Sequence, residues 1–132
     1  MRWALTADHT NPAERWNAIR DWYDDFASSD PAWEHLRPMV DLAAWVAQQP
    51  WAESLYPFTS HQWLCVKLRP GHVPDLNFFA CGPLHDKGLF KFELVVRDRP
   101  IERKLFPLVE ARSTFWNFVR RLESESSDCN PT

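Results

Sequence analysis

Three stretches between residues 63 and 96 alternate apolar and polar side chains, and this alternation constrains the fold more than any other feature of the chain. The alternating residues are 63–68, 76–81 and 89–96, separated by connections rich in Gly and Pro. A period of two is that of a strand with one buried face, and short connections join neighbouring strands. The sequence therefore predicts an antiparallel meander of three strands.

A five-residue connection at 70–74 would place Arg69 opposite Asp75. The same register sets Val66 against Phe78, with Phe92 beside Phe78 on the next strand. Even-numbered apolar residues from 64 to 96 would then share the buried face, because side chains alternate between the two faces of a sheet. The opposite face would carry a candidate binding surface of aromatic and charged side chains. Its predicted residues are His61, Trp63, Cys65, Lys67, Asn77, Phe79, Lys91 and Glu93.

Helix signals flank the alternating region. Asn11 followed by Pro12 and Glu14 is a capping sequence, and Asp30-Pro31 repeats it. Pro38 would kink the second helix or begin a new one, and Pro107 would open a helix at the C-terminal end. Residues 54–58 could add a fourth, edge strand. We expect one domain over 1–132, with frayed ends at 1–10 and 123–132. Its fold would be a two-layer α+β fold, in which a three- to four-stranded antiparallel sheet packs on N-terminal helices and a C-terminal helix.

Composition narrows the class of protein. The chain has 132 residues, 45% hydrophobic and 25% charged, with 8 Trp and no apolar run long enough to predict a membrane span. A count of 3 Cys does not suggest a disulfide framework, so we expect a cytoplasmic protein. Net charge is −3, with −5 in residues 1–60 and +5 in 61–122, which argues against nucleic-acid binding and could steer a charged protein partner.

Two mirrored pairs, His61 with Cys65 and Cys81 with His85, raise the question of a zinc site. In the predicted register Cys65, Cys81 and His61 would share one face. Structural zinc sites pair ligands through tight turns, however, and two residues four apart on one strand are about 13 Å apart. We therefore predict neither a metal nor another cofactor, and the chain contains no phosphate-binding glycine loop.

The sequence leaves two functions open. The leading prediction is a small, tryptophan-rich, non-catalytic domain that binds a protein partner, with an antidote or immunity protein as one analogy and a homodimer as one possible form. It would use the second sheet face or the acidic N-terminal helix. The alternative is a small-molecule-binding protein, or a minor hydrolase built on Cys65, His61 and Glu93. No catalytic residue is assigned, because no oxyanion-hole or nucleophile motif accompanies these side chains.

Overall fold

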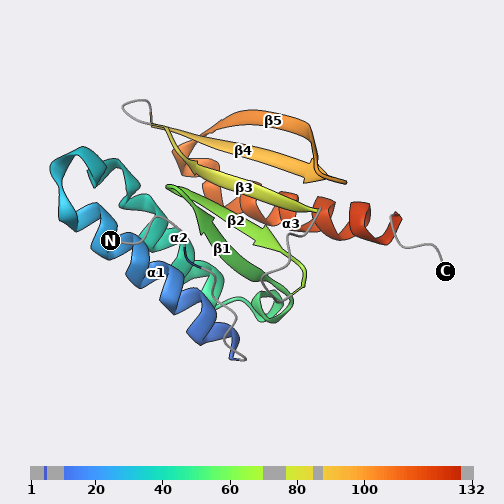
Figure 1. Cartoon of the computed structure of the whole chain (residues 1–132), viewed down its shortest axis with the longest axis horizontal. Coiled ribbons are helices and arrows are strands. Elements are labelled where there is room, and N and C mark those ends of the chain that lie inside the picture. Colours follow the sequence, from blue (N-terminus) through green and yellow to red (C-terminus); the bar gives the residue numbers. More distant parts are fainter. Residues whose placement is uncertain (1–4, 6–10, 70–76, 85–87, 129–132) are drawn as a thin grey trace.

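The structure is a computed structural model that describes residue 5 and residues 11–69, 77–84 and 88–128. It is an α+β fold with one antiparallel sheet of five strands, in the order β1-β2-β3-β4-β5, and with helices before and after it. This confirms the predicted class, with one strand more than expected. In Figure 1, α1 and α2 lie side by side next to the β1 end of the sheet, and α3 crosses behind the strands.

The helical region begins where the capping sequences predict. In α1 (Pro12–Ser29), the Asn11 side chain accepts hydrogen bonds from the Ala13 and Glu14 backbone amides. Asp30 caps a short 3-10 helix, η1 (Pro31–Leu36), by accepting from the Ala32 amide. Pro38 starts a new helix, α2 (Pro38–Ala47), and a second 3-10 turn, η2 (Pro50–Ser54), leads into the sheet. Each of these four helices begins with a proline, at a position where the backbone N–H that proline lacks would have no partner within the helix.

The five strands are β1 (Tyr56–Ser60), β2 (Trp63–Lys67), β3 (Phe78–Pro83), β4 (Leu89–Val96) and β5 (Arg99–Pro107). β1 corresponds to the fourth strand expected near residues 54–58. β5 was not predicted, because nearly all of its side chains are exposed and burial imposes no apolar alternation on it. A two-residue turn joins it to β4, with Arg97 and Asp98 both at positive φ, 53° and 64°, as a type I′ hairpin turn requires.

The predicted register between β2 and β3 is wrong by one residue. Val66 lies opposite Phe79 and Leu64 opposite Cys81, not opposite Phe78 and Ala80. The side chains of β3 therefore swap faces relative to the prediction, since a slip of one residue reverses every side chain. Phe78 and Phe79 are both apolar, so alternation alone could not decide between them. The connection at 70–76, from which the register was inferred, lies outside the described residues.

The core lies between one face of the sheet and all three α-helices. Phe79 is fully buried there, with its ring centroid 5.1 Å from that of Phe115 in α3 and 6.4 Å from that of Phe92 in β4. Trp16 from α1 also contacts Phe115, at 6.0 Å between centroids. The spacing of the apolar residues in α1 predicts one buried helical stripe, and its members Trp16, Ile19, Tyr23 and Phe26 are all buried. Large rings from every layer thus meet at α3, which explains how a short chain fills its core.

The C-terminal helix begins later than predicted. Pro107 is the last residue of β5, and a 3-10 turn, η3 (Leu108–Glu110), separates it from α3 (Ala111–Asp128). A helix that opened at Pro107 would place Leu108 in its buried apolar stripe, but Leu108 is 36% exposed. At its other end α3 continues to Asp128, into the segment expected to be frayed.

Candidate functional site

The face of the sheet opposite the helices, here called the distal face, is where the sequence placed the binding residues. Trp63, Cys65 and Lys67 of β2 lie on this face, opposite to the core residues Leu64 and Val66, but Cys65 at 3% exposure and Lys67 at 4% are themselves buried. Lys91 and Glu93 occupy the same face on β4, because each alternates with the buried rings of that strand. Phe79 is a correction: it belongs to the core, and Phe78 takes its place, with its ring 5.8 Å from that of Phe58 on β1.

Trp63 spans two neighbouring strands of the distal face. A Cβ atom added to Gly82 on β3 would lie 2.6 Å from Cε3 of the Trp63 ring, so the indole rests directly on the glycine backbone. Lys91, paired with Gly82 on the next strand, places its Nζ 5.1 Å from the centre of the Trp63 ring. This is a cation–π contact that only a residue without a side chain at 82 permits.

A second row of the distal face carries charge. Cys65 lies opposite Ala80, Ala80 opposite Glu93, and Glu93 opposite Arg103 on β5. The Arg103 Nε donates to a Glu93 carboxylate oxygen at 2.8 Å, and the Lys91 Nζ lies 3.9 Å from the same oxygen. Glu93 thus neutralises one cation from each side. Arg103 was missed because β5 was missed.

Cys65 cannot act as a nucleophile at neutral pH in this setting. Burial, reinforced by the negative charge of Glu93, raises the pKa of the Cys65 thiol to about 12. The reactive form of cysteine is the thiolate, so this side chain stays neutral and inert. Lys67, at 4% exposure, is buried nearby with its Nζ 5.5 Å from the centre of the Phe58 ring.

The two described cysteines do not converge. Cys81 points into the core while Cys65 points to the distal face, and burial raises the pKa of Cys81 well above its ordinary value. The predicted shared face of Cys65, Cys81 and His61 is therefore wrong, for the same one-residue reason as the register. Among the described residues no group of three or more His, Cys, Asp or Glu side chains could hold a metal ion. His85 lies outside them.

His61 and Asn77 occupy turns instead of the strand face. His61 is exposed in the β1–β2 turn at φ 56°, next to Gln62, whose carbonyl accepts a hydrogen bond from the buried Tyr23 hydroxyl at 2.8 Å. Asn77 precedes β3, and its side-chain oxygen accepts from the Arg97 backbone amide at 2.8 Å. Asn77 therefore holds the β4–β5 turn in place.

The exposed apolar surface lies elsewhere. The large hydrophobic side chains that are exposed in the described part of the chain are Ile101 at 48%, Leu105 at 53%, Leu108 at 36% and Val109 at 90%. We call these four residues the β5–η3 surface. Leu105 lies opposite Lys91 and so belongs to the distal face at its β5 edge, whereas Leu108 and Val109 line a cleft beside α2. No period of two marks this strand in the sequence, because Arg103 interrupts Ile101 and Leu105 on one face and Phe106 follows the charged Glu102 and Lys104 on the other.

Leu108 and Val109 also border a cleft of about 370 Å³ between η3, the start of α3 and the start of α2. Its other lining residues are Arg37, Pro38, Asp41, Leu42, Phe90, Ala111 and Arg112. The volume falls at the lower end of the range for small-molecule sites. The Arg112 guanidinium carbon lies 5.5 Å from the centre of the Trp45 ring.

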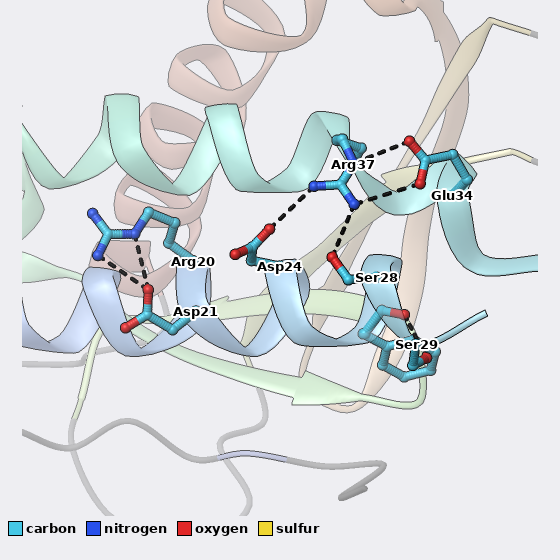
Figure 2. Close-up of polar contacts among 8 residues, drawn as sticks. Arg20, Asp21, Asp24, Ser28, Ser29, Glu34 and Arg37 are labelled. Atoms are coloured by element: carbon cyan, nitrogen blue, oxygen red, sulfur yellow. Dashed lines mark hydrogen bonds and ion pairs between the residues drawn. The ribbon is translucent and has the colours of Figure 1, made fainter. Parts of the chain in front are cut away.

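The acidic helix α1 was the other predicted contact surface, and its carboxylates are partly engaged within the chain. Figure 2 shows Arg37 between Asp24 of α1, at 3.1 Å, and Glu34 of η1, at 3.0 Å. Arg20 likewise contacts Asp21 at 3.0 Å. These exposed ion pairs reduce the charge that α1 can offer a partner, although each contributes little to stability.

Comparisons of this chain with protein-family models, with curated proteins and with solved structures give no match. None of the described helices is both long enough and apolar enough to cross a membrane. The site must therefore be interpreted from its own chemistry.

Proposed function

We propose that this chain is a small, non-catalytic protein-interaction domain that binds its partner through the β5–η3 surface and the adjoining charged row of the distal face. The observation that carries the proposal is the gathering of exposed large hydrophobics in one segment, 101–109, of the described chain. Single exposed apolar residues are ordinary, whereas a concentrated group with a polar rim is typical of an interaction site. Here Arg103 supplies the charged rim beside Leu105, together with Lys91 and Glu93 of β4.

The chemistry of the distal face supports binding over catalysis. Cys65 would be the nucleophile of the alternative hydrolase, but its raised pKa leaves it protonated at neutral pH. His61 lies in an exposed turn, and Glu93 is occupied by Arg103. Trp63, in contrast, offers a half-buried ring beside Lys91, an arrangement common at protein interfaces.

The test is affinity capture from the source organism with two variants of this surface and one control. Leu105→Asp and Val109→Asp each place a charge in the proposed contact, so each should weaken partner binding at least about tenfold. Asp25→Asn changes an exposed carboxylate of α1 and should leave binding unchanged. If Asp25→Asn abolishes capture while Val109→Asp retains it, α1 is the binding surface and the proposal is wrong.

Binding of a small molecule is a second candidate, favoured by the cleft of about 370 Å³ beside Arg112. Its lining is apolar apart from Arg37, Arg112 and Asp41, so an apolar carboxylate that pairs with Arg112 would suit it. A thermal-shift screen with such compounds tests it: stabilisation of the native chain that Arg112→Ala removes would support this function. No shift with any of them would leave the interaction domain as the better account.

A further inference from the structure

The outer edge of β5 is the open edge of the described sheet. At the other end, the backbone carbonyl of Leu5 accepts from the Thr59 amide of β1 at 2.7 Å, so that edge is already bonded at Thr59. β5 pairs only with β4 among the described strands, and Ile101 and Leu105 are about half exposed. An unpaired edge with apolar side chains is a template for another strand.

One hydrogen bond shows which backbone groups of β5 face outward. The Leu108 amide donates to the Gly88 carbonyl at 2.9 Å. Hydrogen-bonded pairs alternate in an antiparallel ladder, so Phe106 and Lys104, opposite Phe90 and Phe92, also direct their backbone groups toward β4. The residues between them direct theirs outward, namely Arg103, Leu105 and Pro107. Pro107 has no N–H to leave unpaired there, which agrees with this assignment.

We propose that β5 pairs antiparallel with β5 of a second copy of this chain, around a two-fold axis at Arg103. This inference rests on the proposed function, because it uses the β5–η3 surface and names its partner. In this register Ile101, the residue of β5 left without a β4 partner at the bulge between Leu94 and Val95, lies opposite Leu105 of the second copy, which joins the exposed apolar side chains of β5 across the interface. Glu102 lies opposite Lys104, which gives opposite charges on both sides of the axis.

Neighbouring registers that keep the same side chains on each face are worse. An axis at Glu102 sets two carboxylates against each other and pairs Ile101 with Arg103. An axis at Lys104 sets two ammonium groups together and pairs Ile101 with Pro107, which lacks an N–H group. The axis at Arg103 also brings two like charges together, but each Arg103 has its own Glu93 carboxylate at 2.8 Å to offset them.

Glu102 is already partnered within the chain, by Lys104 at 3.0 Å and by Arg121. The dimer would therefore add a second cation to an existing ion pair, and most of its stability would come from backbone hydrogen bonds and the apolar contact. A single strand pair lies at the low end of specific interfaces, so we expect a dissociation constant of roughly 10–100 μM.

Sedimentation equilibrium from roughly 5 μM to 1 mM, spanning the expected dissociation constant, measures the association. The mass should rise from 15.6 kDa toward twice that value. Leu105→Pro removes an outward N–H without touching the β4 ladder, so it should keep the wild-type circular dichroism spectrum and remain monomeric. Asp25→Asn, an exposed change on α1 far from β5 in the sequence, should still dimerise. A monomer across the whole range for the wild type would overturn the proposal.

Cysteine cross-linking checks the register, with Cys129 replaced by Ser in every sample. Two copies of Arg103→Cys would face each other at about 5.5 Å between Cα atoms, within the reach of a disulfide. Two copies of Leu105→Cys would be about 13 Å apart along the strands and should not cross-link. Equal cross-linking of both variants would show random collision and overturn the register.

The two proposals fail in different ways. If the wild type stays monomeric but captures another protein in a manner that depends on Leu105 and Val109, the second copy is wrong and the interaction domain stands. If it neither self-associates nor captures a partner, both fall.

Discussion

Replacing Gly82 by Ala should destabilise the fold through the Trp63 ring. The new Cβ would lie 2.6 Å from Cε3 and 2.9 Å from Cζ3 of the indole. Ordinary carbon contacts lie near 3.5–4.0 Å, so the ring must move by roughly 1 Å and loosen its contact with Lys91. Such overpacking costs about 1–3 kcal/mol, which lowers Tm by roughly 4–11 °C for a chain of this length. Urea unfolding followed by far-ultraviolet circular dichroism measures the loss.

A double-mutant cycle isolates the cause. In a Trp63→Ala background the clash has no partner, so Gly82→Ala should cost nothing or stabilise the fold by up to about 1 kcal/mol, because alanine restricts the unfolded chain. The difference between the two backgrounds, which is the expected coupling energy, is therefore about 1–4 kcal/mol. An equal cost in both backgrounds would refute the reasoning, since Trp63 would then not lie over Gly82. That result would favour the register inferred from the sequence, which sets Leu64 against Ala80.

Three further predictions test the buried groups. Burial raises the pKa of the Cys65 thiol from 9.0 to about 12, so above pH 9 the unfolded chain binds fewer protons than the folded chain and the free energy of unfolding should fall as pH rises. Urea unfolding at a series of alkaline pH values should show a smaller fall for Cys65→Ala than for the wild type. An equal fall for both proteins would contradict the raised pKa. The Trp16 indole nitrogen is buried with no acceptor among the described residues, so losing its N–H should cost little. Trp16→Phe should therefore lower the free energy of unfolding by under about 1.5 kcal/mol, and Trp16→Ala by about 3–5 kcal/mol. Equal losses for the two variants in thermal unfolding would count against this. Asn77→Ala removes the acceptor for the Arg97 amide and should cost about 1 kcal/mol, with amide hydrogen exchange quickened at the β4–β5 turn; unchanged exchange there would rule out the positioning role.

The elements whose signals are local were predicted correctly. Asn11 and Asp30 cap the helices they precede because a capping side chain acts within three residues of itself. The α1 stripe follows from the helical period alone, and β2 and β4 follow from their alternation. β5 was not predicted, because an edge strand with exposed side chains carries no burial pattern in its sequence. Pro107 was interpreted as the start of a helix, whereas it is the last residue of β5.

The sequence by itself determined the α+β class and five of the predicted distal-face residues, because these depend on periodicity within single strands. Only the tertiary structure decided which of Phe78 and Phe79 is buried, because both rings are apolar and either register satisfies the alternation. Contacts with Phe115 and Phe92, together with room for Trp63 over Gly82, select Phe79 for the core. That choice places Cys65 and Cys81 on opposite faces of the sheet.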